Sequence, residues 1–269
     1  MYHFVEIVVM IFVTDLDKTL VYSRQPKHCC VEYCEGREVT YITKQAHTLL
    51  YQLLSTPRFH LIPCTLRSFE QTNRIRFITP ELTPILICDN GFSIYHRGIL
   101  DMEWDRQMQN QLTSYPNAEM YRFLKDYVAA NNIPLSQIKS NRDAFYTLIF
   151  QNAEDAAHYA SSIVSLVPLK KYYIDLQGRK LYIIPNFLDK SIALLHIKNQ
   201  MQSETIVTAG DSSVDENFVR AGDIAILPGH SLLHIPSAIR TTAVGIYAGE
   251  ELLEMVCQYW IKENSHKRV

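Results

Sequence analysis

The stretch that decides the fold is an apolar run at residues 7–14 (IVVMIFVT), followed directly by Asp15-Leu16-Asp17-Lys18-Thr19. A short apolar run bounded by polar residues is typical of a strand that is covered on both faces. Two carboxylates at the end of such a strand occupy one small volume, where each disfavours ionisation of the other unless they share a cation or a proton. A turn that caps a following helix is the structural alternative for this motif.

The same pattern recurs along the chain, with short apolar runs that end in polar or turn residues. Further strands are predicted at residues 59–64, 84–88, 205–209 and 224–227, and helices at residues 43–54, 187–200 and 249–261. Alternation of strands and helices predicts an α/β fold, a Rossmann-like parallel sheet with helices on both faces. In such sheets the ligand lies beyond the carboxyl ends of the strands.

The middle of the chain follows another pattern. Residues 92–96, 144–151, 170–176 and 180–184 are predicted strands, and residues 117–130 and 153–166 are predicted helices. The last two strands form a hairpin that turns at Gln177-Gly178-Arg179. We therefore expect a catalytic core of residues 1–90 and 186–269, with an α+β cap domain inserted at residues 91–185.

Four more polar residues follow the predicted strands or open the predicted helices. They are Thr65, Lys190, Asp211 and Asp215. Each alone has an ordinary structural explanation, as a capping hydroxyl, an exposed lysine or a helix cap. Together with Asp15 and Asp17 they gather four carboxylates at one sheet edge, and an all-oxygen site of that kind suits Mg²⁺.

This ordered set resembles the four motifs of the haloacid dehalogenase-like (HAD) phosphohydrolase superfamily. The long insertion resembles the C2 type of cap, and the nearest subgroup is similar to sucrose-phosphate and mannosyl-phosphoglycerate phosphatases. Cys88-Asp89-Asn90-Gly91 resembles the signal that leads into such a cap.

The resemblance implies a role for each residue of the set. Asp15 would be the nucleophile that forms an aspartyl-phosphate, and Asp17 the acid and then the base. Thr65 and Lys190 would hold the transferring phosphoryl group. The implied Mg²⁺ ligands are Asp15, the backbone carbonyl of Asp17 and Asp211, with Asp215 in or just behind that shell. Arg67 and Asn90, which lie at strand ends, are the candidate substrate contacts. Lys18, Leu66 and Val214 depart from the residues that are usual at these positions.

Composition narrows the function classes. The chain has 269 residues, a formal net charge of −2 and only 9 glycines, less than half the usual share of about 7%. Neither glycine-rich phosphate loop, G-x-G-x-x-G or G-x-x-x-x-G-K-[ST], is present. The near-neutral net charge shows no clustered excess of Lys and Arg of the kind that binds nucleic acid. The apolar N-terminus is too short for a bilayer span of about 20 residues and lacks the flanks of a signal peptide.

These features predict a cytoplasmic protein with reduced cysteines and no membrane or nucleic-acid partner. Zinc at Cys29, Cys30 and Cys34 is disfavoured because no second pair lies at ligand spacing. Either Met1 or Met10 could be the start. The sequence indicates no oligomeric state.

The predicted function is a magnesium-dependent phosphatase that acts on a small phosphorylated metabolite such as a sugar phosphate. A phosphotransferase or mutase that uses the same aspartyl-phosphate is the alternative, because the acceptor is chosen by the cap. A receiver-like signalling module is disfavoured, since receivers have about 120 residues and no inserted cap.

Overall fold

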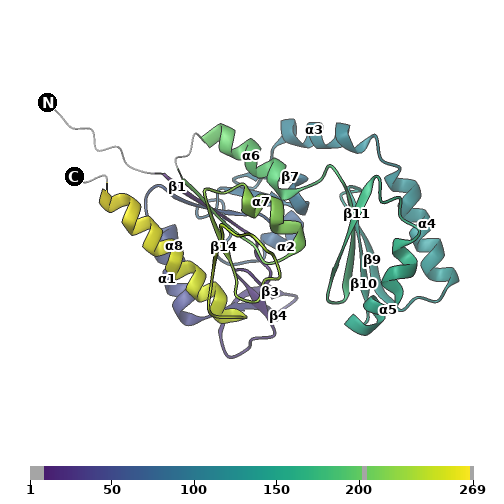
Figure 1. Cartoon of the computed structure of the whole chain (residues 1–269), viewed down its shortest axis with the longest axis horizontal. Helices are drawn as coiled ribbons and strands as arrows, with labels where there is room; N and C mark the ends of the chain where they lie inside the picture. Colours follow the sequence, from purple (N-terminus) through teal and green to yellow (C-terminus); the bar gives the residue numbers. More distant parts are fainter. Residues whose placement is uncertain (1–8, 202–204, 267–269) are drawn as a thin grey trace. The chain divides into compact units, whose positions relative to one another are not determined.

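The computed structural model describes residues 9–201 and 205–266 and divides the chain into two compact units (Figure 1). The first unit comprises Met1–Asp101 and Asp189–Val269, and the second comprises Met102–Leu188. Each unit has its own hydrophobic core. The expected domain limits at 90/91 and 185/186 stay a prediction.

A parallel five-stranded sheet is the centre of the first unit. Its strands are β1 (Met10–Thr14), β5 (Phe59–Pro63), β13 (Thr205–Ala209), β14 (Ile224–Leu227) and β15 (Ile239–Arg240), in the order β15-β14-β13-β1-β5. All neighbours are parallel. Every residue of β1 is buried, as its unbroken apolar run predicts. The α/β fold is therefore confirmed; residues 7 and 8 of the predicted first strand lie outside the described residues.

Helices cover both faces of this sheet. Helices α1 (Lys44–Leu54) and α8 (Ile246–His266) lie together on one side in Figure 1, and α6 (Lys190–Met201) and α7 (Glu216–Arg220) lie on the other. The side chain of Thr43 accepts a hydrogen bond from the backbone of Ala46 and so begins α1 where the sequence predicts a helix.

One strand prediction is confirmed only in part. The run at residues 84–88 was expected to join the parallel sheet, but β6 (Ile85–Cys88) pairs antiparallel with β7 (Ser93–His96), which pairs with β8 (Ile99–Leu100). The turn between β6 and β7 has positive φ at Asp89 (53°), Asn90 (60°) and Gly91 (93°) and sends the chain straight back. A single parallel bridge, Cys64 to Ile87, connects β6 to the end of β5.

A second small sheet was not predicted. It consists of β2 (Tyr22–Ser23), β3 (Cys29–Cys34) and β4 (Arg37–Ile42) in the order β2-β4-β3. Outside this sheet, a short helix, α2 (Phe69–Thr72), follows β5. Strands β3 and β4 form a hairpin through Glu35 and Gly36, both with positive φ. From the sequence, this segment is distinguished only by its three cysteines.

The second unit is an antiparallel sheet with helices packed on it. The sheet has the order β11-β12-β10-β9, formed by β9 (Leu135–Asn141), β10 (Phe145–Phe150), β11 (Tyr172–Gln177) and β12 (Lys180–Pro185). Helices α4 (Asn117–Ala130) and α5 (Ala153–Val164) share one core with it and lie on the same side in Figure 1; α3 (Met102–Leu112) precedes them. The predicted α+β architecture and the hairpin at Gly178 are confirmed.

Candidate active site

The acidic motif lies where β1 ends between its two neighbours. The backbone N–H of Asp15 donates to the carbonyl of Ala209 at 2.8 Å, and the N–H of Cys64 donates to the carbonyl of Thr14 at 2.8 Å. The carboxyl ends of β13 and β5 therefore flank Asp15. Asp211 and Thr65, which follow those two strands, are placed at the same sheet edge.

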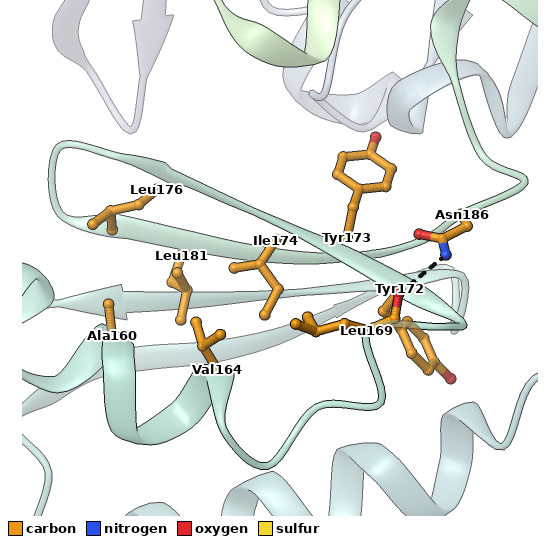
Figure 2. Close-up of a pocket in the computed structure, with 9 residues that line it drawn as sticks. All are labelled: Ala160, Val164, Leu169, Tyr172, Tyr173, Ile174, Leu176, Leu181 and Asn186. Atoms are coloured by element: carbon orange, nitrogen blue, oxygen red, sulfur yellow. Dashed lines mark hydrogen bonds between the residues drawn. The ribbon is translucent and has the colours of Figure 1, made fainter.

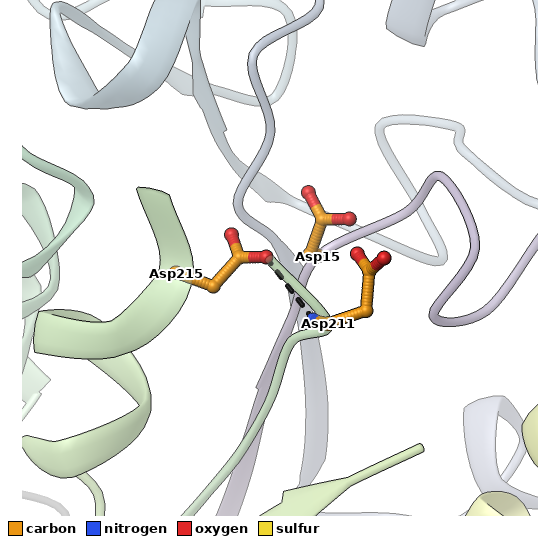
Figure 3. Close-up of side chains that lie close together, drawn as sticks. All are labelled: Asp15, Asp211 and Asp215. Atoms are coloured by element: carbon orange, nitrogen blue, oxygen red, sulfur yellow. Dashed lines mark hydrogen bonds between the residues drawn. The ribbon is translucent and has the colours of Figure 1, made fainter. Parts of the chain in front are cut away.

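Three carboxylates meet at this edge, as Figure 3 shows. One oxygen from each of Asp15, Asp211 and Asp215 lies within 4.8 Å of the others. Gly210 is required for this approach, because a Cβ at that position would lie 2.5 Å from the Cβ of Asp215. The predicted convergence is confirmed for these three side chains, whereas that of Asp17, the fourth predicted carboxylate, does not belong to the cluster.

Asp215 is the most constrained member of the cluster. It is fully buried, and its Oδ2 accepts hydrogen bonds from the N–H of Asp211 (3.1 Å), the N–H of Ser212 (2.9 Å) and the Ser212 hydroxyl (2.8 Å). Its Oδ1 accepts from Lys190 at 2.6 Å. Asp215 therefore holds both the loop that carries Asp211 and the lysine.

Lys190 is a buried cation between two of the carboxylates. Its Nζ donates to Oδ1 of Asp15 at 2.7 Å and to Oδ1 of Asp215 at 2.6 Å, and the residue is only 1% exposed. Burial works against the charged form, but the negative charges of Asp15 and Asp215 outweigh it and raise the pKa of the lysine.

Gly91 lets the turn after β6 approach the start of α6, since a Cβ there would lie 2.8 Å from the carbonyl oxygen of Asp189.

The cluster carries excess negative charge. Three carboxylates around one ammonium leave two negative charges without a partner among these four groups. Burial, and then the neighbouring carboxylates, raise the pKa of Asp15 well above its ordinary value despite Lys190. Burial and the charge of Asp215 raise the pKa of Asp211 to about 7. A divalent cation would match both the charge and the oxygen donors.

The side chain of Asp17 forms an ion pair with Arg67. Its two carboxylate oxygens accept hydrogen bonds from Nε and Nη2 of Arg67, both at 2.7 Å, and its side chain is 52% exposed. Arg67 was a candidate substrate contact, and in the structure its guanidinium contacts carboxylates of the chain itself.

Thr65, which follows β5, and Asn90, in the turn after β6, are both buried. The Thr65 hydroxyl accepts from the N–H of Arg67 at 3.2 Å, and the Thr65 carbonyl accepts from the N–H of Asn90 at 3.0 Å. The roles of Thr65 with the phosphoryl group and of Asn90 with the substrate stay predictions.

The departures at Lys18 and Leu66 have different structural meanings. Lys18 has φ of 62°, the left-handed region that favours glycine, so this chain places a lysine in a strained turn at a cost of roughly 1–3 kcal/mol. The His230 ring contacts the Lys18 carbonyl at 2.9 Å and accepts from the Gly245 N–H at 3.2 Å, which supports that turn. Leu66 has no positive φ and therefore needs no glycine.

Sequence reasoning missed several residues that support the site. Ser231 donates to the Asp211 carbonyl at 2.8 Å, and Glu32, on β3, contacts Arg67 at 2.9 Å. Both come from segments with no motif, and neither is near in sequence to its partner. Nothing in the local pattern distinguishes them from surface residues.

The second unit contains an apolar pocket of about 520 Å³ between α5 and the β11–β12 hairpin (Figure 2). Tyr172, Tyr173 and Leu181 are among its lining residues, together with Asn186, whose side chain donates to the Leu169 carbonyl at 3.4 Å. Its lining includes no cation for a phosphate. In the described part of the chain, no helix has the length and apolarity that a membrane span requires.

The chain also resembles known proteins. The chain matches the sucrose-6F-phosphate phosphohydrolase family over residues 8–232. A search of curated proteins finds no match. The family match and the inserted second unit argue against a receiver-like module.

Solved structures share the fold at low sequence identity. The sucrose-phosphatase of Synechocystis sp. PCC6803, solved in complex with sucrose and phosphate, is 14% identical, with a TM-score of 0.62 and coverage of 94% of this chain and 98% of that chain. The C-terminal domain of C. albicans trehalose-6-phosphate phosphatase is 11% identical, with a TM-score of 0.61 and coverage of 93% of each chain. A trehalose-6-phosphate phosphatase related protein is 17% identical, with a TM-score of 0.57 and coverage of 94% and 99%. With the family match over most of its length, the chain belongs to the HAD-like sucrose-6F-phosphate phosphohydrolases, a family of phosphoric monoester hydrolases.

Proposed function

We propose that this chain is a magnesium-dependent phosphatase that hydrolyses a sugar phosphate through an aspartyl-phosphate on Asp15. The observation that carries the proposal is the buried carboxylate of Asp15, which Lys190 contacts at 2.7 Å beside the carboxylates of Asp211 and Asp215. A carboxylate is a competent covalent nucleophile, and phosphoryl transfer otherwise depends mainly on positioning and charge stabilisation.

The residues at the sheet edge fit Mg²⁺. Asp15, Asp211 and the backbone carbonyl of Asp17 would hold the ion, with Asp215 behind them because its oxygens already accept from Lys190, Ser212 and Asp211. When bound, Mg²⁺ neutralises negative charge between the carboxylates and a phosphate dianion.

The reaction divides into two displacements. An oxygen of Asp15 bonds to phosphorus while the ester P–O bond breaks, and the electron pair stays on the sugar oxygen, which takes a proton from Asp17. A water then bonds to phosphorus and gives its proton to Asp17, and the bond between phosphorus and Asp15 breaks. Asp15 and Asp17 end as they began, and Lys190 keeps Asp15 in place throughout.

A disaccharide phosphate is the proposed substrate class, with sucrose 6F-phosphate as the first candidate. The family match supports it, and so do the sucrose and trehalose-6-phosphate phosphatases that share the fold. A cytoplasmic location and the absence of a nucleic-acid or membrane partner stay predictions from the sequence.

A panel of sugar phosphates in ¹⁸O-labelled water tests the proposal. We expect Mg²⁺-dependent release of phosphate, with sucrose 6F-phosphate or another disaccharide phosphate giving the highest kcat/KM and one labelled oxygen in each phosphate. Transfer of the phosphoryl group to a second sugar hydroxyl, without label, would establish the phosphotransferase alternative. Equal rates on all esters would refute the substrate class.

Binding of Mg²⁺ to the substrate-free protein is expected to weaken as the pH falls. The pKa of Asp211 is about 7, so a proton competes with the cation below that pH. Affinity should drop by up to about 10-fold per pH unit below about pH 7 and change little above it. Titration calorimetry near pH 6 and near pH 8 measures this difference.

The stability of the metal-free protein should change in the opposite direction. Because the folded-state pKa of Asp211 lies above its ordinary value of 3.8, this group stabilises the fold at low pH, and the contribution is lost as the pH rises towards about 7. Asp211→Asn is the control and should remove both Mg²⁺ binding and this part of the pH dependence. Equal Mg²⁺ affinity near pH 6 and near pH 8 would contradict the assignment.

A further inference from the structure

Glu32 is a buried carboxylate outside the acidic cluster. It lies on β3 and is 0% exposed. Its Oε2 accepts from Nη1 of Arg67 at 2.9 Å and from the Thr40 hydroxyl at 3.1 Å, and its Oε1 accepts from Nε of Arg74 at 3.1 Å. A buried charge of this kind is retained only where partners compensate it, and here two arginines do.

Arg67 joins this buried carboxylate to the proposed acid and base. Its Nη1 donates to Glu32, while its Nε and Nη2 donate to the two oxygens of Asp17 at 2.7 Å. The guanidinium is planar and rigid, so the direction of Glu32 fixes the direction of the fork that holds Asp17. We call Glu32, Arg67 and Asp17 the arginine bridge.

We propose that Glu32 is a positioning residue, which holds the Asp17 carboxylate through Arg67 in the place from which it serves the leaving group. This inference rests on the proposed function, because it concerns the proton step of that reaction. It assigns a purpose to the β3–β4 hairpin and gives Arg67 a role other than contact with the substrate.

The exposure of the three side chains shows why the Asp17 carboxylate needs a positioning contact. The Asp17 side chain is 52% exposed, that of Arg67 is 11% exposed, and that of Glu32 is buried. An exposed carboxylate samples several rotamers, whereas proton transfer needs a heavy-atom distance of about 2.6–3.2 Å. The bridge connects the exposed carboxylate of Asp17 to a fixed point in the interior.

A purely structural role for Glu32 makes a different prediction. If Glu32 only fastened β3 to Arg74, its loss would slow every substrate alike or none. A positioning role slows the formation of the aspartyl-phosphate only for substrates whose leaving group needs a proton, whereas the attack of water, which Asp17 assists as a base, slows alike for every substrate. A sugar alkoxide needs one, and p-nitrophenolate does not, because it is a stable anion near neutral pH.

The experiment compares the single-turnover rate of aspartyl-phosphate formation from the best sugar phosphate with that from p-nitrophenyl phosphate, in the full-length protein with Mg²⁺. For Glu32→Gln we expect about a 10-fold loss on the sugar phosphate, a part of the factor of about 10²–10⁴ that a general acid contributes, because Asp17 itself is still present. Loss on p-nitrophenyl phosphate should be under about 3-fold, and KM should change little, because Glu32 does not touch substrate.

Arg74→Gln is the matched control, since it removes the other arginine partner of Glu32 and leaves the arginine bridge intact. It should not alter the ratio of the two activities. Arg67→Lys keeps a charge but cannot span two carboxylates, and it should reproduce the selective loss. Arg67→Lys decides the question if Glu32→Gln does not fold.

An equal loss on both substrates, or no loss, in folded Glu32→Gln would overturn the inference. The same selective loss in Arg74→Gln would also overturn it, because loosening of β3 would then be the cause. Failure of the proposed function is a separate result: the wild type would then hydrolyse neither ester, or Asp15→Asn would retain activity.

Discussion

Asp15→Asn is expected to abolish phosphate release while the protein stays folded. The amide has nearly the same shape as the carboxylate but cannot attack phosphorus, so kcat on p-nitrophenyl phosphate should fall by at least about 10³-fold. The buried lysine keeps its second partner, Asp215, at 2.6 Å. Because burial raises the pKa of Asp15, loss of its charge should leave thermal stability equal to or above that of the wild type.

Asp126→Asn is the matched control for this experiment. Asp126 is an exposed residue of α4, and its substitution should leave both activity and stability unchanged. Near-normal hydrolysis by folded Asp15→Asn would remove Asp15 from the reaction. Loss of folding in Asp15→Asn would show instead that the carboxylate has an essential structural role.

Lys190→Met is expected to cause the largest loss of stability. It leaves Asp15 and Asp215 buried without the cation that contacts both, and breaking a buried pair in this way costs about 3–5 kcal/mol. Urea unfolding in the presence of a chelator measures the free energy of unfolding. The loss should be larger at high pH than at low pH, because protonation relieves the repulsion between the two carboxylates.

Lys198→Met on the same helix is the control for charge alone. Its side chain is 34% exposed and pairs with Asp223 at 3.4 Å, so the expected change is under about 1 kcal/mol. Addition of Mg²⁺ should recover part of the stability of Lys190→Met but not its activity. A loss of less than about 1 kcal/mol in Lys190→Met would contradict the buried geometry.

The parallel core was predictable because its strands are covered on both faces. Strands β1, β5, β13 and β14 are mainly apolar runs, and the polar residues that follow them converge because carboxyl ends of parallel strands share an edge. The convergence of Asp15, Asp211 and Asp215 follows from that topology.

The partners of β6 could not be predicted in the same way. Its apolar run has the same appearance as the core strands, and its antiparallel pairing follows from the turn at Asp89, Asn90 and Gly91. Only the backbone conformation shows that two residues other than glycine adopt positive φ there. The turns at Asn90 and Lys18 use residues other than glycine, so the positions of the glycines in the sequence do not reveal them.

Glu32 could not be found because its burial comes from residues far along the chain. A glutamate in the sequence Cys-Cys-Val-Glu-Tyr-Cys is typical of an exposed position, and its arginine partners lie 35 and 42 residues away. A single sequence does not show that these charges compensate one another. The contacts of the side chains, rather than the local pattern, reveal the arginine bridge.

The most direct test of the central claim is the site of covalent phosphorylation. Asp17→Asn should slow the attack of water, so the protein is mixed with p-nitrophenyl phosphate and Mg²⁺, quenched in acid, digested and analysed by mass spectrometry. The account predicts one phosphoryl group on Asp15 and none in the doubly substituted Asp15→Asn, Asp17→Asn protein. Turnover without a phosphorylated peptide, or a phosphoryl group on another residue, would contradict it.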